Sequence, residues 1–159
     1  MSSGFVHLHT HSSYSPMWGI PTLEALCQAA RTQGQDRLAL TDTNGLYGAI
    51  RFLEVAKHEG LKPILGAELV HKAHRAVLLA KTPAGYANLC RLLSARHEES
   101  TFDFIAAVAR YRAGLIILSD DLSALRTWRK DSPKDVYVEL TPGSDIQEAI
   151  TFSRRNGLS

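Results

Sequence analysis

Apolar positions along this chain follow two alternating spacings. Short runs rich in β-branched and apolar residues are separated by longer stretches with helical periodicity. The clearest helical stretch is Pro21–Thr32, in which Leu23, Leu26, Cys27 and Ala30 fall on one face. Gly34 follows it as a stop signal. The pattern predicts short buried strands that alternate with amphipathic helices.

The predicted elements number about six strands and six helices. The strands are predicted at Phe5–Thr10, Arg37–Thr41, Lys62–Glu68, Val70–Lys81 (clearest at Ala76–Ala80), Leu115–Leu118 and Val136–Leu140. The helices are predicted at Pro21–Thr32, Leu46–Glu59, from Pro83 onward, Ser100–Ala113, Asp121–Lys130 and Ser144–Asn156, the last opened by a capping box of Ser144 and Gln147.

This alternation predicts an α/β fold with a parallel sheet, open or closed into a barrel. With 159 residues, the chain is expected to form a single domain. A helix that leads away from a strand normally returns to another strand, and none follows the last predicted helix. We therefore expect the natural protein to continue beyond Ser159, with one sheet edge uncovered.

Composition narrows the class of protein. Apolar residues make up 45% and charged residues 21%, a globular balance, and the net charge of +2 shows no strongly basic surface for nucleic acid. No apolar run is long enough to span a membrane, and no secretory signal is evident, so we expect a soluble cytoplasmic domain with no membrane partner. Cys27 and Cys90 lie in apolar helical patterns and are expected to be free, buried thiols.

Histidines gather at the end of the first predicted strand. His7, His9 and His11 alternate, so strand geometry would place all three side chains on one face. His9 and His11 would be about 7 Å apart at their Cα atoms, close enough to share one metal or to bracket two. Solvated histidines at a polar strand end are the alternative.

Carboxylates follow the next two predicted strands. Asp42 comes directly after the second strand and Glu68 ends the third. Asp42 could bind a metal or orient a ligating histidine, although Asp-x-Asn-Gly also favours a simple turn. Because ligand sites form at the carboxyl ends of parallel strands, we expect His9, His11 and Glu68 to converge, with Asp42 nearby.

Other polar residues have simpler interpretations. His71, His74 and Arg75 are expected in a solvated loop, and Asp121 is expected to cap a helix rather than to bind a metal. His58 and His97 are expected to face solvent.

Four sequence blocks resemble a known family. FVHLHTHSSYS (Phe5–Ser15), ALTDTNGLYGAIRF (Ala39–Phe52), LKPILGAEL (Leu61–Leu69) and VLLAKTPAGYANLCRLLS (Val77–Ser94) occur in the order found in PHP (polymerase and histidinol phosphatase) domains. More narrowly, they resemble the N-terminus of bacterial DNA polymerase III alpha subunits.

The resemblance implies a distorted (β/α)7 TIM-like barrel, here truncated before its last strand, with up to three metal ions at its mouth. It also implies that residues 1–159 are a single PHP domain at the N-terminus of a longer polymerase chain. The implied partners are the downstream polymerase domains, and DNA through the parent polymerase.

Residue by residue, the resemblance retains only part of the family's ligand set. His9 and His11 match its H-x-H pair and Glu68 matches its strand-three carboxylate, whereas Trp18, Thr43 and Arg75 replace ligands. Trp and Thr are poor metal ligands, and Arg75 adds a cation. The implied cofactor is a divalent metal (Zn, Mn or Fe), weakly bound or absent, and the implied role is structural. The alternative is a metal-dependent phosphoesterase, histidinol phosphatase-like or a 3′-5′ exonuclease.

Overall fold

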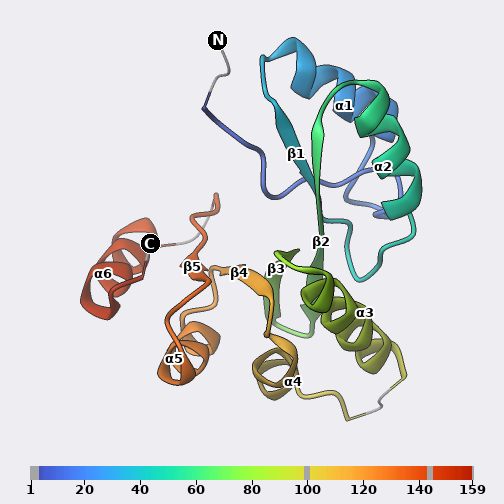
Figure 1. The fold of residues 1–159 in the computed structure, drawn as a ribbon. Coiled ribbons are helices and arrows are strands. Elements are labelled where there is room, and N and C mark those ends of the chain that lie inside the picture. Colours follow the sequence, from blue (N-terminus) through green and yellow to red (C-terminus); the bar gives the residue numbers. More distant parts are fainter. Residues whose placement is uncertain (1–3, 99–100, 143–144, 159) are drawn as a thin grey trace. The chain divides into compact units, whose positions relative to one another are not determined.

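The computed structural model describes residues 4–98, 101–142 and 145–158 (Figure 1). The chain divides into two compact units, Met1–Glu68 and Leu69–Ser159. The described residues form five strands and six helices, which confirms the mixed α/β class. Each unit is considered by itself below.

The first unit places two helices against a parallel strand pair. It contains α1 (Leu23–Thr32), β1 (Arg37–Leu40), α2 (Ala49–His58) and most of β2 (Lys62–His71). Strand β1 pairs in parallel with β2, and α1 and α2 lie beside one another (Figure 1). One apolar core joins these elements, built from Leu23, Cys27, Ala30, Leu38, Leu40, Phe52, Val55, Ala56 and Leu61.

Local signals set the ends of these helices. The Thr22 side chain accepts a hydrogen bond from the Ala25 amide and caps α1, so Pro21 lies outside the helix rather than in its first turn. Gly34 adopts a left-handed backbone angle after α1, as its stop signal predicted, and Gly60 does the same after α2. Helix α2 begins at Ala49, three residues later than the periodicity indicated.

The strand predicted at Phe5–Thr10 is wrong, although the segment lies alongside β1. Residues 5–10 form no regular ladder. Instead the segment runs along β1 through single bonds, from the Ala39 amide to the His7 carbonyl (3.0 Å) and from the Thr41 amide to the Thr10 carbonyl (2.9 Å). The ladder is interrupted because the Thr10 amide donates to the Thr41 hydroxyl (2.8 Å) rather than to a backbone carbonyl.

The second unit is a three-stranded mixed sheet with helices. Strand β3 is antiparallel to β4, and β4 is parallel to β5. The unit contains β3 (His74–Ala80), α3 (Pro83–Glu98), α4 (Phe104–Tyr111), β4 (Leu115–Ser119), α5 (Leu122–Asp131), β5 (Val136–Val138) and α6 (Ile146–Asn156).

The antiparallel pair corrects the expectation of a parallel sheet. Only Lys72 and Ala73 separate β2 from β3, and Lys72 has a φ of 55°. A two-residue connection leaves no room for a crossover helix, so the chain must reverse direction. The single run predicted at Val70–Lys81 is therefore the end of one strand, a tight turn and the start of another.

Side-chain caps begin three helices of the second unit. Asp121 caps α5 through the Ser123 and Ala124 amides, which confirms its predicted role. Asp103 caps α4, which starts at Phe104 rather than near Ser100. Asp145 caps α6 through the Glu148 amide. Ser144 and Ser100, which the sequence placed at these two helix starts, lie outside the described residues.

Of the two cysteines expected to be buried free thiols, Cys27 is buried as predicted, whereas Cys90 is only half-buried. Both are free thiols. Trp128 is completely buried, and its indole N–H donates to the Ile105 carbonyl (3.0 Å), so its one polar atom is satisfied. Within the described ranges, no helix has the length and apolar character needed to cross a bilayer.

Candidate metal centre

His9, His11 and Glu68 meet in the first unit. The His9 Nε2 and His11 Nε2 atoms are 3.0 Å apart. His9 Nε2 lies 3.5 Å from Glu68 Oε1, and His11 Nε2 lies 3.7 Å from Glu68 Oε2. One ligand atom from each residue lies within 4.8 Å of the others, so the convergence expected from the strand ends is present.

The neighbouring backbone explains why the two imidazoles share a face. The segment that carries them is fastened to β1 on both sides of His9, at His7 and Thr10. In extended backbone, alternate side chains point the same way. Thr10 accordingly points away from the cluster, and its hydroxyl donates to the Ala39 carbonyl.

Thr43, at the position where the resemblance implies that a histidine ligand has been replaced, holds the cluster by hydrogen bonds. Its hydroxyl donates to Glu68 Oε2 (2.9 Å) and lies 3.3 Å from His11 Nδ1. Backbone bonds bring the two residues together: Thr43 forms a parallel bridge with Glu68, and the Asn44 amide donates to the Glu68 carbonyl (2.8 Å). Thr43 thus orients two of the candidate ligands.

Asp42 lies behind the cluster. It is 2% exposed, and its carboxylate accepts bonds from the Ser12 amide (2.7 Å), the Ser12 hydroxyl (2.8 Å) and the Ser15 hydroxyl (2.7 Å). The Ser15 oxygen in turn lies 3.1 Å from His11 Nδ1. Asp42 therefore reaches His11 through Ser15, an arrangement that orients a ligand rather than supplies one.

The hydroxyl protons fix the tautomer of His11. The Ser15 proton goes to Asp42 and the Thr43 proton goes to Glu68, so both oxygens face His11 Nδ1 as acceptors. His11 must then carry its proton on Nδ1. Its Nε2 lone pair is left facing His9 and Glu68, which is the form of imidazole that binds a metal.

The environment favours an ionised carboxylate at Glu68. Burial acts to raise its pKa, but hydrogen bonds to His9 and Thr43, together with the attraction of the His11 and His9 rings when they are protonated, outweigh burial, so the pKa lies below its ordinary value. An ionised, buried carboxylate beside two imidazoles supplies one negative and two neutral donors, a set suited to zinc, manganese or iron.

Sequence reasoning missed Ser12 and Ser15, which connect Asp42 to the cluster. Both are completely buried. Serine is common in loops, and nothing in their spacing separates them from Ser13, which is exposed. The one available signal was the run of serines after His11. Any of these hydroxyls that became buried would need a hydrogen-bond partner nearby.

His71 was predicted as a solvated loop residue, but it ends β2 and its ring contacts Phe102 edge-on. His74 and Arg75 were predicted as solvated loop residues too, and this is also wrong. They begin β3 in the second unit, because the tight turn ends at Ala73. His74 Nδ1 lies 2.6 Å from Asp121 Oδ2, and its ring stacks on Phe104. The Arg75 guanidinium donates to Asp120 Oδ2 (2.6 Å).

The remaining residues singled out in the sequence have exposed side chains. Trp18 is 75% exposed, so it stands out from the loop that follows the histidines. The side chain of His58 is 85% exposed and His97 is also exposed, as predicted. Among the described residues, His9, His11 and Glu68 form the one group of three or more close metal-ligating side chains.

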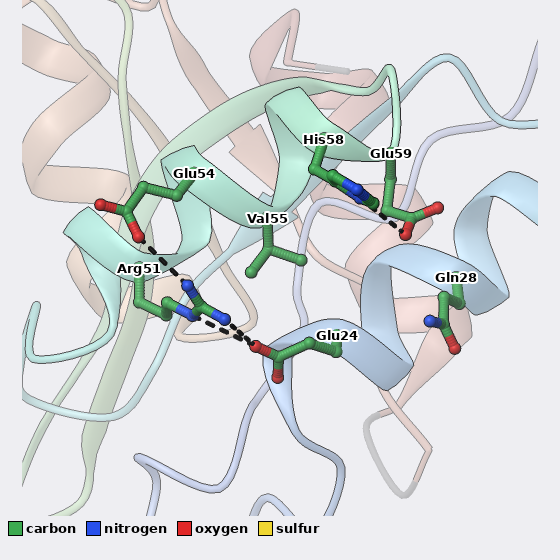
Figure 2. Close-up of a pocket in the computed structure, with 7 residues that line it drawn as sticks. All are labelled: Glu24, Gln28, Arg51, Glu54, Val55, His58 and Glu59. Carbon is green, nitrogen blue, oxygen red and sulfur yellow. Dashed lines mark hydrogen bonds and ion pairs between the residues drawn. The ribbon is translucent and has the colours of Figure 1, made fainter.

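A separate hollow of about 430 Å³ lies between α1 and α2. Figure 2 shows Arg51 on α2 pointing toward Glu24 on α1 and Glu54 on its own helix. Its guanidinium donates to Glu24 (2.9 and 3.2 Å) and to Glu54 (3.2 Å). These charges pair with one another at the surface, so the hollow is explained by an ion-pair network joining the helices.

Comparisons with known proteins agree on the fold. The chain resembles a protein from Bifidobacterium adolescentis assigned to the metal-dependent phosphoesterases, with a TM-score of 0.64 and 13% identity over 96% of this chain and 84% of that one. It also resembles a two-domain protein from Bacteroides vulgatus that contains a predicted PHP-like metal-dependent phosphoesterase, with a TM-score of 0.61 and 14% identity over 97% of this chain and 49% of that one. At these identities the likeness shows the fold alone.

Sequence relatives are bacterial DNA polymerases. An error-prone DNA polymerase of Symbiobacterium thermophilum is 47% identical over 94 residues, which cover 58% of this chain and 9% of that protein. A DNA polymerase III subunit alpha of Treponema pallidum is 35% identical over 140 residues, which cover 75% of this chain and 12% of that protein. The chain thus spans about a tenth of these relatives. The PHP domain model matches residues 7–141, and the chain belongs to the PHP domain family.

Proposed function

We propose that this chain serves as the PHP domain of a polymerase chain of the DNA polymerase III alpha or error-prone type, acting in the cytoplasm in DNA replication or repair synthesis. The similarity to both polymerases, at 47% and 35% identity, supports this proposal. Its partners would be the downstream polymerase domains, and it would meet DNA through them.

The domain's own task, we propose, is to hold one divalent metal at His9, His11 and Glu68. Two metal–ligand bonds of about 2.1 Å at a tetrahedral angle separate their donor atoms by about 3.4 Å. The three separations here are 3.0, 3.5 and 3.7 Å. The observation that carries the proposal is the hydroxyl pattern around His11, because it presents Nε2 as a lone pair before any metal arrives. Asp42 would orient His11, since its carboxylate is already engaged by Ser12 and Ser15.

A structural role for this metal fits the site better than catalysis. Metal-dependent phosphate hydrolysis needs an activated water and commonly a second metal for the leaving oxygen. The positions that would complete a larger ligand set are Trp18, which points outward, Thr43, which hydrogen-bonds the ligands, and Arg75, which is paired with Asp120. We therefore expect little or no hydrolysis of phosphate esters.

The test combines metal content with turnover. Protein purified without chelator is analysed for zinc, manganese and iron, and is then assayed on a generic phosphate ester and on a DNA 3′ end with each metal added. We expect about one bound metal in the parent chain, none in His9→Ala or Glu68→Gln, and no metal-dependent turnover. His58→Ala, which removes an exposed histidine, is the matched control.

The competing function is a metal-dependent phosphoesterase. The fold shared with two proteins of that description favours it. Metal-dependent turnover that disappears in both His9→Ala and Glu68→Gln, but not in His58→Ala, would establish this alternative and reject the structural role.

A further inference from the structure

Large apolar side chains stand in water on two segments of the first unit. One segment is the loop 12–22 before α1, and the other is 43–50, which leads into α2. Together they carry six of the eleven large apolar side chains that are exposed among the described residues. The exposed fractions are 43% for Tyr14, 103% for Met17, 75% for Trp18, 92% for Ile20, 72% for Tyr47 and 68% for Ile50.

Backbone hydrogen bonds fold the loop 12–22 back on itself. The Ser13 amide donates to the Pro21 carbonyl (2.9 Å), which brings the two ends of the loop together. The Trp18 and Gly19 amides both donate to the Ser15 carbonyl (3.1 and 2.9 Å). The four apolar side chains of the loop are therefore held in one compact structure instead of being spread along an extended segment.

The ring of Tyr14 joins this loop to the second segment. A Cβ built on Gly48 would lie 2.8 Å from Tyr14 Cδ2, so the ring packs directly on the backbone of Gly48. Tyr47 immediately precedes Gly48, and Ile50 follows two positions later in the first turn of α2. The loop thus contacts the residues that carry the other two apolar side chains, and the six side chains form one surface, called here the apolar patch.

The loop is fixed in the shape that exposes its part of the apolar patch. The Ser12 and Ser15 hydroxyls are completely buried and donate to the Asp42 carboxylate (2.8 and 2.7 Å). Met17 has a φ of 68°, a left-handed angle that residues other than glycine seldom adopt. Because the loop is already ordered, little conformational entropy is lost when a partner covers it.

The apolar patch is compatible with a second copy of itself. Residues 12–23 and 43–50 contain no Asp, Glu, Lys or Arg, although these make up 21% of the chain. A face with a net charge repels its own copy across a two-fold axis, whereas an uncharged apolar face does not. Depletion of charge and enrichment of Trp, Tyr and Met are also the composition found at the centre of protein interfaces.

The apolar patch is large enough for a stable dimer. At about 200 Å² for a large side chain, the six exposed fractions leave roughly 900 Å² of mainly apolar surface in water. The largest apolar patch on a typical monomer is about 300–600 Å². Each partner in an interface of standard size contributes about 800 Å², so two copies of the patch would supply one such interface.

We propose that the apolar patch is the interface of a homodimer, in which the patch of one chain packs against the same patch of a second copy. Trp18 and Ile20, which stand far out of the loop, are the side chains that lose most contact with water on association. The inference concerns self-association of this chain and does not depend on whether the candidate metal centre is occupied.

Sedimentation equilibrium of the full chain at about 1–100 μM tests the dimer, because interfaces of standard size reach micromolar or tighter affinity. We expect the mass to rise with concentration from 17.5 kDa toward twice that value. The chain has two tryptophans, and Trp128 is completely buried, so quenching by iodide reports on Trp18. Quenching should fall over the concentration range in which the mass doubles.

Substitutions place the interface on the apolar patch. Trp18→Ala and Ile20→Glu should each weaken the dimer by at least about 30-fold, as expected for central interface residues. Both side chains are exposed, so the folded unit should be retained, as checked by an unchanged urea unfolding midpoint. Ile146→Glu is the matched control on α6 of the second unit, where Ile146 is 49% exposed, and it should dimerise like the parent.

Three results would overturn the dimer. They are a parent chain that stays monomeric at about 100 μM, a dimer that persists unchanged in Trp18→Ala and Ile20→Glu, and a dimer that leaves iodide quenching of Trp18 unaltered. If the chain is monomeric, binding to phosphatidylcholine vesicles that is lost in Ile20→Glu would identify a lipid surface as the occupant of the patch. Metal content, measured separately, tests the proposed function alone.

Discussion

At the scale of single residues, the candidate metal centre depends on where four protons lie. Ser15 and Thr43 give theirs to Asp42 and Glu68, which leaves His11 protonated at Nδ1. His9 Nε2 then donates to His11 Nε2 across 3.0 Å. A metal would replace that shared proton, so the geometry already present in the protein is close to the liganded one.

Removal of one hydroxyl tests this proton arrangement. We expect Ser15→Ala to weaken metal binding by about ten-fold, because His11 loses a partner that fixes its tautomer. The measurement is a competition titration against a chelator of known affinity. Ser13→Ala removes an exposed hydroxyl from the same loop and should leave affinity unchanged. Equal affinities in the two variants would contradict the orienting role of Ser15.

The candidate ligands could be predicted from the sequence, whereas their supports could not. Strand-end position and alternation were enough to bring His9, His11 and Glu68 together. The roles of Ser12, Ser15 and Thr43 depend on which hydroxyl meets which carboxylate, and this follows from tertiary contacts between residues about thirty positions apart.

At the scale of elements, Asp121 carries two tasks at the start of α5. One oxygen caps the helix and the other meets His74 of β3. Burial acts to raise its pKa, but hydrogen bonds from Ser123, His74 and the Ala124 amide and the charge of His74 outweigh burial, so the pKa lies below the ordinary value of 3.8. The ionised carboxylate thus joins a helix to a strand within the second unit.

Asp121 makes stability depend on pH in a defined direction. A carboxylate whose pKa is lower in the folded chain contributes fully above its unfolded pKa, and the contribution is lost as pH falls through the folded pKa. We expect Asp121→Ala to lower the free energy of unfolding by about 1–2 kcal/mol at pH 7, mainly through the lost cap. The difference from the parent should shrink below pH 3.8, measured by urea unfolding at several pH values.

A companion variant separates the two tasks of Asp121. Asp121→Asn keeps a capping oxygen but loses the charge beside His74. We expect it to be closer in stability to the parent than Asp121→Ala at neutral pH. If both variants lose the same stability, the cap is not the main contribution.

Helix α3 approaches the backbone before β4 too closely for any side chain at Gly85. A Cβ there would lie 1.9 Å from the Gly114 carbonyl oxygen. Helix propensity alone predicts that Gly85→Ala stabilises the protein, whereas this contact predicts the opposite sign. We expect a loss of about 2 kcal/mol, in the range of other overpacked sites, measured by denaturant unfolding.

Gly60→Ala is the useful comparison for Gly85→Ala. Gly60 has open space around it but a φ of 72°, so alanine there meets backbone strain without a clash. A smaller loss, of about 1 kcal/mol, is expected. Stabilisation by Gly85→Ala would show that α3 can move away from Gly114 at little cost.

The periodicity of the sequence predicted where helices and strands lie better than it predicted which strands pair and in which direction. Helices that begin with a polar N-cap, such as α1 and α5, start within two residues of their predicted starts. The direction of β3 was missed because Lys72 gives no glycine or asparagine signal for a turn, although it adopts a left-handed backbone angle. The N-terminal segment was predicted as a strand but forms no regular ladder with β1. The reason is that the Thr10 amide donates to the Thr41 hydroxyl instead of to a backbone carbonyl.

At the scale of the whole molecule, all three candidate ligands belong to one compact unit. His9, His11 and Glu68 lie within Met1–Glu68, the unit that has its own core around α1, β1 and α2. A ligand that binds the folded state stabilises it in proportion to the logarithm of its excess over the dissociation constant. Bound metal should therefore stabilise the folded state of this unit more than that of the second unit.

Hydrogen exchange gives that expectation a direct measurement. Addition of the bound metal at about 100 times its dissociation constant should slow exchange of core amides in β1 and α2 by up to about 100-fold. Amides of β4 and α5, in the second unit, should change less. Equal protection of both units would show that they open together, and no protection anywhere would contradict metal binding to the folded state.

The thiol of Cys27 gives the first unit a chemical reporter of its own. The side chain is completely buried in the core between α1, β1 and α2, and burial raises its pKa to about 11, with the charges of Glu59 and Glu24 acting in the same direction. Only the thiolate reacts with alkylating reagents, so in the closed unit this sulfur is both shielded and protonated. Its modification rate therefore measures how often the core opens, and a replacement of the half-buried Cys90 by serine would leave it as the single thiol label among these 159 residues.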